Sequence, residues 1–278
     1  MRDAIDGDVV YSEILMSSAA ADTHTILLVE GDTDVTVLSG FMDGEGLNLL
    51  DCFGKNNLMH AFQLTVLHGP SHVWAFRDRD FMSQSPHDKM VLTSYYDLEM
   101  EIVQAGDSLT RLLRSFGDRN LLARLGTDGA VKAALLCLEA ASRIGALRLV
   151  SEQLGLGIRC KNFPVGEVQM ADEPKICITR LADLAVQRTP SLTQDQVSML
   201  EKEVQSCLDS HPVEYLVNGH DLCRVVAALG RKHWGLAESA RTLEKALRAA
   251  FSLEEFKRTT AFQQLHAVVP RFADVVAA

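Results

Sequence analysis

The stretch ILLVEGDTDV, residues 26–35, decides the fold prediction, because a short apolar run ends there on a group of acids. Residues 26–29 are apolar and are bounded by polar residues and glycine, which is typical of a buried parallel strand. Glu30 stands at the end of this run, and Asp32 and Asp34 follow it. Carboxylates repel one another and resist leaving water, so this strand end favours a nearby positive charge.

Two further apolar runs extend the pattern. Residues 47–52 (LNLLDC) and 72–76 (HVWAF) are strand candidates, and residues 34–42 and 56–68 have helical spacing. Strands that alternate with short helices predict a parallel sheet with crossover connections, which is the α/β class. The sequence has no Gly-x-Gly-x-x-Gly or Walker lysine motif, so a nucleotide-binding loop is not predicted.

The chain changes character after residue 105. Apolar residues recur every three to four positions, which predicts helices over 109–116, 129–154, 193–208, 221–231, 237–251 and 253–265. The stretch 155–168 breaks this pattern and is a candidate for an extra strand and a loop that return to the sheet. We therefore predict an α/β catalytic domain over 1–105 and a mostly helical region over 106–278, which would serve dimerisation or partner docking.

Composition limits the classes of function. The chain of 278 residues is 47% hydrophobic and carries a formal net charge of -10, which argues against a protein that coats nucleic acid non-specifically. Its six cysteines include no C-x-x-C pair, which favours reduced, packed thiols over a zinc site. No apolar stretch approaches the length of a membrane span and no signal-peptide core is found, so we expect a cytoplasmic protein without membrane partners.

Later acids point to the same edge of the predicted sheet. Asp78 and Asp80 follow the third strand and, two positions apart, would project the same way in an extended segment. Because ligands gather at the carboxyl ends of parallel strands, we expect Glu30, Asp78 and Asp80 to meet there, and Glu99 in 94–103 to return to this edge. Such a group of carboxylates suits Mg²⁺ or Mn²⁺ and predicts phosphoryl transfer, of which phosphodiester hydrolysis is the simplest case.

The order of the motifs resembles a known family. LVEGDTDV, FGKNNLMHAF, FRDRDF, YDLEMEIV and NGHDL follow one another as in TOPRIM-like, OLD-related nucleases, a prokaryotic family that includes the nuclease subunit of the PARIS anti-phage defence system. The resemblance covers residues 20–105 and the NGHDL element at 218–222. It implies a TOPRIM (Rossmann-like) domain and a Mg²⁺-dependent endonuclease that cleaves DNA or RNA, tRNA included, as a toxic effector. It also implies restraint by an ABC-type ATPase partner and a homodimer when active.

The resemblance further implies roles for individual residues. The metal ligands would be carboxylates, namely Glu30, Asp34, Asp78, Asp80 and Glu99. Glu30 would also be the candidate general base. Lys55 and Asn56, which follow the second strand, would contact substrate phosphate. Lys161 in RCKNF is the candidate for the lysine with which OLD nucleases stabilise the transition state.

Simpler interpretations stay open beside these. Asp78 and Asp80 could lie in a solvated loop, paired with the arginines beside them. Asp97 is as well placed to cap a helix as to bind metal, and the NGHDL element favours a helix start. For the whole chain, the alternatives are another metal-dependent phosphoryl-transfer enzyme, such as a phosphatase or a primase-like nucleotidyl transferase, and a non-catalytic TOPRIM-fold adaptor. The tyrosines have no context typical of a topoisomerase nucleophile.

Overall fold

The chain folds into two compact units. The computed structural model describes residues 5–20, 24–42, 46–270, 272 and 276. The sheet unit comprises Met1–Glu101 and Leu253–Ala278, and the helical unit comprises Ile102–Ser252. The last segment therefore belongs with the sheet, whereas the sequence pattern had grouped it with the helices. Within the described residues, no helix combines the length and the hydropathy needed to cross a membrane.

Within the described residues, the sheet has four parallel strands in the order β2-β1-β3-β4. The strands are β1 (Thr25–Val29), β2 (Leu47–Asp51), β3 (Val73–Arg77) and β4 (Met90–Leu92). β1 lies in the interior of the sheet and all five of its residues are buried, which explains its uninterrupted apolar run. The three predicted strands and the α/β class are confirmed, and β4, which has only three residues, was not predicted.

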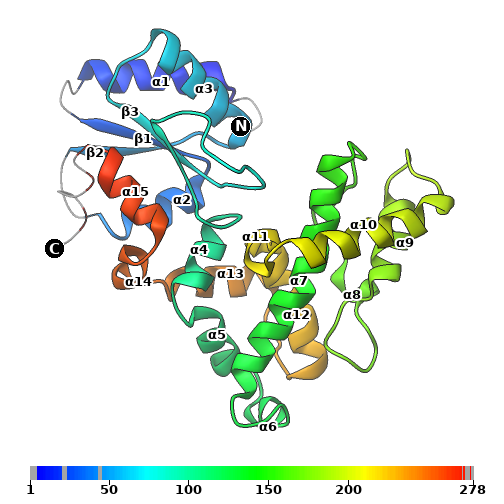
Figure 1. Ribbon diagram of the computed structural model, residues 1–278. Coiled ribbons are helices and arrows are strands. Elements are labelled where there is room, and N and C mark those ends of the chain that lie inside the picture. Colours follow the sequence, from blue (N-terminus) through cyan, green and yellow to red (C-terminus); the bar gives the residue numbers. More distant parts are fainter. Residues whose placement is uncertain (1–4, 21–23, 43–45, 271, 273–275, 277–278) are drawn as a thin grey trace. The chain divides into compact units, whose positions relative to one another are not determined.

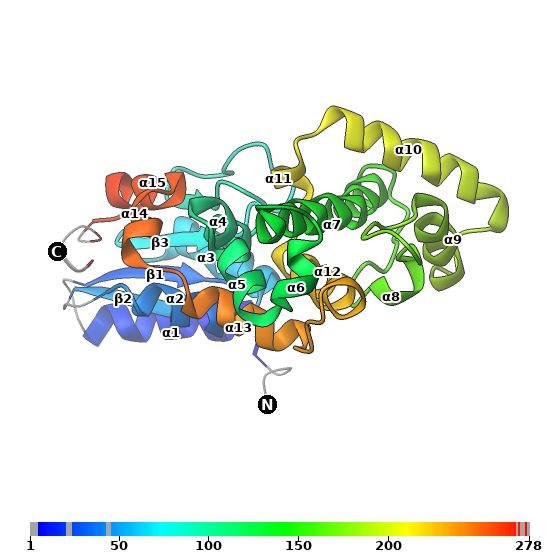
Figure 2. The ribbon, with the colours of Figure 1, turned by 90° about the horizontal axis from the view of Figure 1, so that it is seen from below.

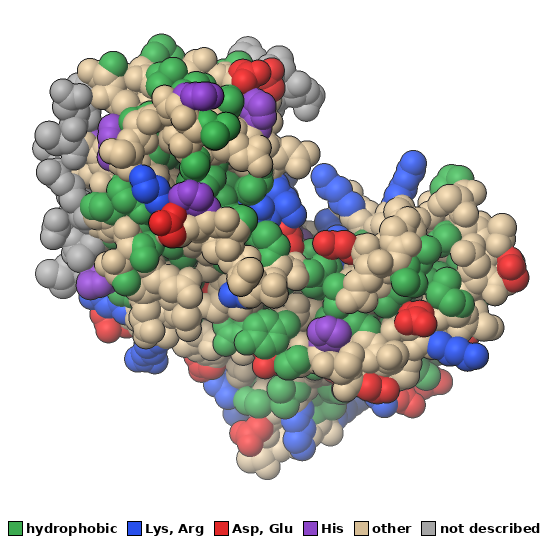
Figure 3. Space-filling model, turned by 45° about the horizontal axis from the view of Figure 1, so that its top comes forward, with side chains coloured by type: hydrophobic (Ala, Val, Ile, Leu, Met, Phe, Trp, Pro, Cys, Tyr) green, Lys and Arg blue, Asp and Glu red, His purple; other side chains and the backbone are tan. Residues whose placement is uncertain are grey.

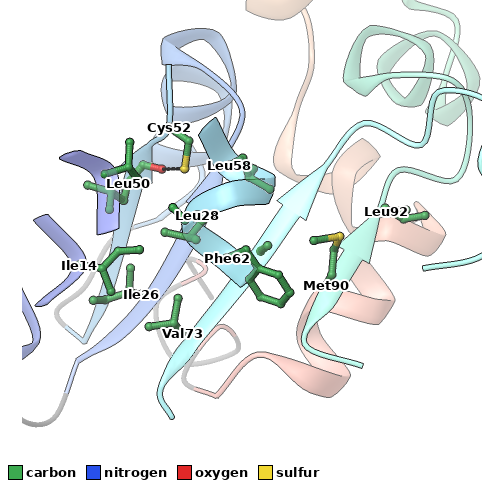
Figure 4. Packing of buried hydrophobic residues seen from close by; sticks show 13 residues of the cluster. Ile14, Ile26, Leu28, Leu50, Cys52, Leu58, Phe62, Val73, Met90 and Leu92 are labelled. Carbon is green, nitrogen blue, oxygen red and sulfur yellow. Dashed lines mark hydrogen bonds between the residues drawn. The ribbon is translucent and has the colours of Figure 1, made fainter. Parts of the chain in front are cut away.

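Helices cover both faces of the sheet (Figures 1 and 2). α1 (Gly7–Ala20) and α3 (Lys55–His68) lie on one face, and α2 (Asp32–Ser39) and α15 (Thr260–Val268) lie on the other (Figure 1). Figure 4 shows the core under α1 and α3, where Ile14, Leu28 and Phe62 pack together. α4 (Leu98–Ala105) begins in the sheet unit, and α14 (Leu253–Lys257) precedes α15.

The helical unit is organised around one long helix, α7 (Gly129–Gln153). The other elements are α5 (Ser108–Phe116), α6 (Arg119–Ala123), α8 (Val165–Val168), α9 (Ile178–Arg188), the 3₁₀ helix η2 (Gln194–Gln196), α10 (Val197–Ser210), α11 (Val213–Leu216), α12 (Gly219–His233) and α13 (Ala240–Ala249). Gly145 lets α11 approach α7 closely, because a Cβ at Gly145 would lie 1.9 Å from the carbonyl oxygen of Leu216.

Most predicted helices are confirmed, with two corrections. The segment 155–168 adds no strand to the sheet; it belongs to the helical unit and contains only the short helix α8. Its apolar residues, Ile158, Phe163 and Val165 among them, are buried there. The predicted helix 253–265 is two helices, α14 and α15, and α9 was not predicted.

The face of the sheet unit that carries α1 and α3 is partly apolar at its surface (Figure 3). Large hydrophobic side chains are exposed on both helices: Val9, Leu15, Met16, Val66 and Leu67. A cavity of about 320 Å³ opens beside α3 and is lined by Met59, Phe62 and Met90, among others. Most of the hydrophobic residues of this unit are nevertheless buried in its core.

Candidate active site

The candidate site lies at the carboxyl ends of β1, β2 and β3. Glu30 follows β1 directly, Asp78 follows β3, and Gly54 and Lys55 follow β2 after a short turn. The backbone N–H of Gly54 donates a hydrogen bond of 2.7 Å to the carbonyl oxygen of Glu30, so the ends of β1 and β2 are joined. The strand ends meet because all the strands are parallel, as the sequence pattern predicted.

Glu30 is a partly buried carboxylate with unused hydrogen-bonding capacity. Its side chain is 18% exposed, and Oε1 accepts no hydrogen bond from the described residues, although Nε of Arg77 lies 3.5 Å away. Burial raises the pKa of Glu30, Asp80 raises it further, and Arg77 and Lys55 oppose this rise. A raised pKa suits a general base, and an oxygen that accepts no hydrogen bond has capacity left for a proton or a metal ion.

Asp78 lies against the N-terminus of α4. Its Oδ1 accepts a hydrogen bond of 3.1 Å from the backbone N–H of Leu98, the first residue of that helix. The neighbouring Asp97 is buried, and its Oδ1 accepts a hydrogen bond of 3.0 Å from the N–H of Met100. Asp97 therefore caps α4, as one of the two interpretations of this residue predicted. The partial positive charge of the helix end stabilises both carboxylates.

Asp78 is also the centre of a cluster of like charges. Burial raises the pKa of the Asp78 carboxyl well above its ordinary value, and four neighbouring carboxylates raise it further, namely Asp97, Glu30, Asp34 and Glu99. Four of the five predicted metal ligands, Asp78 included, therefore lie near enough to affect this one pKa. The helix dipole offsets only part of their mutual repulsion.

Asp80, the fifth predicted ligand, is held differently. Its Oδ2 lies 2.5 Å from Nζ of Lys55 and 2.9 Å from Nη2 of Arg77. The Arg77 side chain is only 2% exposed, so a buried guanidinium is built into the acidic site. Asp80 has a φ of 50°, a left-handed conformation that Asp tolerates better than most residues, and its N–H donates to the carbonyl of Tyr96. The alternative interpretation, in which Asp80 pairs with a neighbouring arginine, is thus correct for Asp80 and Arg77.

Two charged residues beside the site have structural roles. The Arg79 guanidinium donates to the backbone carbonyls of Thr93, Met82 and Ser83. Glu101 is buried and accepts a hydrogen bond from the backbone N–H of Ser94. These contacts fix the segments that follow β3 and β4. Sequence reasoning did not predict the burial of Arg77, and the only signal for it was the position of this arginine as the last residue of an apolar strand.

The remaining predicted residues lie in different surroundings. Asp34 caps α2, since its Oδ2 accepts a hydrogen bond of 3.0 Å from the N–H of Gly31. Asn56 is exposed on the first turn of α3, next to Lys55. Lys161 is exposed in the loop before α8, in the helical unit. Its role as a catalytic lysine stays a prediction.

The NGHDL element binds to the loop that carries Lys161. Oδ1 of Asn218 accepts the N–H of Asp221 and so caps α12, as predicted. The buried Asp221 carboxylate pairs with Arg148 and with Arg224, and the Arg224 guanidinium also donates to Oδ1 of Asn162 at 2.5 Å. Two sequence motifs that are far apart in the chain therefore form one polar network in the helical unit.

Carboxylate charge and oxygen donors are the features of this site that suit a divalent metal ion. Among the residues that the structure describes, no three His, Cys, Asp or Glu side chains are grouped so that they could hold a metal ion. The oxygen donors around Asp78 nevertheless suit Mg²⁺ or Mn²⁺. Among the described residues, Oε1 of Glu30 accepts no hydrogen bond, and burial together with neighbouring carboxylates raises the pKa of Asp78. Both features agree with a bound cation, because a nearby positive charge favours the ionised form of a carboxylate.

Comparison of the chain with models of protein families gives no match, and comparison with curated proteins gives none either.

Proposed function

We propose that the sheet unit is the catalytic part of a metal-dependent endonuclease of the TOPRIM type that hydrolyses phosphodiester bonds in DNA or RNA. The observation that carries this proposal is the cluster of like charges around Asp78, together with the unbonded Oε1 of Glu30, at the carboxyl ends of β1 and β3. Glu30 and Asp78 would hold Mg²⁺ or Mn²⁺, with Asp34 and Glu99 beside them. The ion would polarise a phosphoryl oxygen and lower the pKa of a water.

The other residues of the site would bind the substrate and move a proton. Glu30, with its raised pKa, would accept a proton from the attacking water. Lys55 is 49% exposed and Asn56 follows it on the exposed first turn of α3, so both can reach a phosphate oxygen. Arg77, which is buried, would hold Asp80 and Glu30 in position. These roles would account for the mixture of acids and cations at one edge of the sheet.

One observation favours a second candidate, a non-catalytic binding module. Asp80 is neutralised by Lys55 and Arg77, so one acid of the expected Asp-x-Asp pair already has positive partners. A module that only binds would need no free carboxylate there. The Glu30–Arg77 contact is looser, at 3.5 Å, and leaves Oε1 without a hydrogen bond, which is why we prefer the nuclease.

The test compares isosteric variants in a cleavage assay. Plasmid DNA and a tRNA mixture are incubated with the wild type, Glu30→Gln, Asp78→Asn and the control Asp88→Asn, with Mg²⁺ or Mn²⁺. Asp88 belongs to the sheet unit and its side chain is 88% exposed. We expect cleavage by the wild type and the control, and a loss of about a hundredfold or more in the other two.

A thermal shift with Mg²⁺ or Mn²⁺ supplies a readout besides activity. We expect the melting temperature of the wild type and of Asp88→Asn to rise with the ion, and that of Asp78→Asn to stay constant, because an ion that binds the folded state stabilises it. Cleavage by Glu30→Gln at the wild-type rate, or cleavage that persists in chelator, would overturn the nuclease proposal. Absence of both cleavage and thermal shift would select the binding module.

We further propose that a partner, an ABC-type ATPase, restrains the nuclease during anti-phage defence. The resemblance of the motifs supports this, and the exposed apolar side chains on α1 and α3 offer a surface for a partner or a second copy. Co-expression with such an ATPase, followed by size-exclusion chromatography, would test it. Co-elution that Leu67→Asp and Met16→Asp abolish is the expected result, and separate elution would contradict it.

A further inference from the structure

The helical unit contains a cavity that the candidate nuclease site does not use. It has a volume of about 710 Å³ and lies where the end of α5, α6 and the first turn of α7 meet. Two arginines, Arg114 and Arg119, and Thr127 supply its polar wall, and Leu122, Ala123 and Ala130 supply its apolar wall. Cavities of about 300–1,000 Å³ with a mainly apolar lining and a few polar groups are typical of sites for small organic ligands.

Positive charge gathers at this cavity without a matching acid. Within the part of the chain that the structure describes, Arg114 and Arg119 are exposed and make no hydrogen bond or ion pair. A third cation is close, since Nζ of Lys132 lies 2.9 Å from the position of a Cβ at Gly126, a residue of the lining. The protein as a whole carries a net charge of -10, so this local excess is not a consequence of its composition.

The nearby acids do not neutralise these cations. Asp118 uses its Oδ1 to cap α6, where it accepts the N–H groups of Asn120 and Leu121 at 2.8 and 2.9 Å. Asp128 is exposed, is not part of the lining, and forms no side-chain cap for α7. The backbone of the first turn of α7 lines the cavity at Gly129 and Ala130 and adds the partial positive charge of a helix of 25 residues.

We propose that this cavity binds a nucleotide. The phosphate would lie between Arg114 and Arg119, with Lys132 at its edge, because guanidinium groups bind phosphate through paired, charge-assisted hydrogen bonds. The base or sugar would lie against Leu122, Ala123 and Ala130. The nucleotide is either free in solution or one residue of a nucleic-acid strand. The proposal does not depend on the nuclease site, because all of these residues belong to the helical unit.

The test measures binding to the full chain by isothermal titration calorimetry. The probes are ADP, inorganic phosphate and a short single-stranded oligodeoxynucleotide. The double variant Arg114→Gln/Arg119→Gln removes the charge, and Ala123→Phe fills the exposed side of the cavity while it keeps both arginines. The matched control is Arg241→Gln, which removes an exposed arginine from α13 in the same unit. Circular dichroism confirms that each variant is folded.

We expect the double variant to weaken binding at least about tenfold, since two charge-assisted hydrogen bonds to phosphate are lost. Ala123→Phe should weaken it similarly, and Arg241→Gln should leave it unchanged. Binding of ADP identifies a free nucleotide, and binding of the oligonucleotide alone identifies a strand; in each case the loss in both variants supports the site. No binding of any probe by the wild type, or equal binding by the double variant or by Ala123→Phe, would overturn the proposal. The titrations contain a chelator, so the metal-dependent site at Glu30 neither cleaves the oligonucleotide nor binds its phosphates through a metal, and only binding that both variants reduce is assigned to this cavity.

Discussion

Nζ of Lys55 lies 2.5 Å from Oδ2 of Asp80, although the two residues are 25 positions apart in the chain. The contact joins the helix that follows β2 to the turn that follows β3. Arg77 binds the same carboxylate oxygen from the buried side. Asp80 is therefore shared by one cation that faces solvent and one that is buried. The two cations should contribute differently to the free energy of unfolding.

Removal of the exposed cation should cost little stability. The Lys55 side chain is 49% exposed, and an ion pair in such a position contributes less than about 1 kcal/mol to the free energy of unfolding. Lys55→Met should therefore unfold in urea at nearly the wild-type midpoint. If Lys55 contacts substrate phosphate, the same variant should lose cleavage activity. A large loss of stability in Lys55→Met would show that the lysine is structural.

Removal of the buried cation, Arg77, should cost much more stability than removal of Lys55. Arg77 is 2% exposed, and its loss leaves Glu30 without its nearest positive partner and Asp80 with Lys55 alone. We expect Arg77→Met to lower the free energy of unfolding by about 3 kcal/mol, measured by urea denaturation. In the double variant Arg77→Met/Asp80→Asn, part of this loss should be recovered. Equal midpoints for Arg77→Met and Lys55→Met would contradict the assignment of the two cations.

The strand end at Glu30 was predictable, whereas the pairing of its neighbours was not. Residues 26–29 had to be buried as an apolar run, and parallel strands bring their carboxyl ends to one edge whatever the loops do. Whether the Asp80 carboxylate faces a metal ion or the ammonium group of Lys55 depends on side-chain rotamers and on the left-handed φ of 50° at Asp80. Neither leaves a periodic signal in a sequence.

The unit to which 253–278 belongs could not be read from the sequence either. The apolar spacing of α14 and α15 is the same whether these helices pack on a sheet or on other helices. Their position is fixed by contacts far apart in the chain, such as the ring stacking of Phe256 on Phe41 at 5.2 Å between centroids. α1 was overlooked because acids and polar residues interrupt its apolar positions, although Val10 and Ile14 are fully buried.

Neutralisation of Asp78 should stabilise the protein at neutral pH. Its pKa is raised well above the ordinary value of 3.8, so the folded state binds more protons than the unfolded state between these two pKa values. The free energy of unfolding therefore falls as the pH rises through this window, and the ionised carboxylate is destabilising above it. Asp78→Asn, which keeps an oxygen to accept the N–H of Leu98, removes this cost.

The melting temperature measured against pH tests this expectation. The melting temperature of Asp78→Asn should exceed that of the wild type at neutral pH, and the difference should shrink as the pH falls toward the ordinary carboxyl pKa. Asp88→Asn, at an exposed position, should follow the wild type throughout. An Asp78→Asn variant that melts below the wild type at neutral pH would show that the fold stabilises the ionised Asp78 carboxylate.

The cysteines should react at very different rates in the native protein. All six are free, and burial raises the pKa of Cys137 and raises that of Cys160 to about 11. Both thiols should stay protonated and shielded at mildly alkaline pH, so alkylation by iodoacetamide should be slow. Cys177 is only half-buried and should react first. Mass spectrometry of native and denatured samples measures this, and rapid native labelling of Cys137 would show that this thiol is not buried.

The C-terminal segment should be indispensable to the sheet unit. Phe256 is fully buried, stacks on Phe41 and contacts Phe262 edge-on at 5.2 Å between ring centroids. Phe256→Ala should lower the free energy of unfolding by about 3–5 kcal/mol, because the cavity left by a buried aromatic ring is not refilled. Leu67→Ala, at a position that is 69% exposed on α3, is the control and should change stability by about 0.5 kcal/mol or less. Urea denaturation measures both changes.

Hydrogen exchange would locate the loss of stability in Phe256→Ala, which should fall on β1, β3 and β4. If Phe256→Ala left the protection of these strands unchanged, the segment Leu253–Ala278 would not be part of the sheet unit.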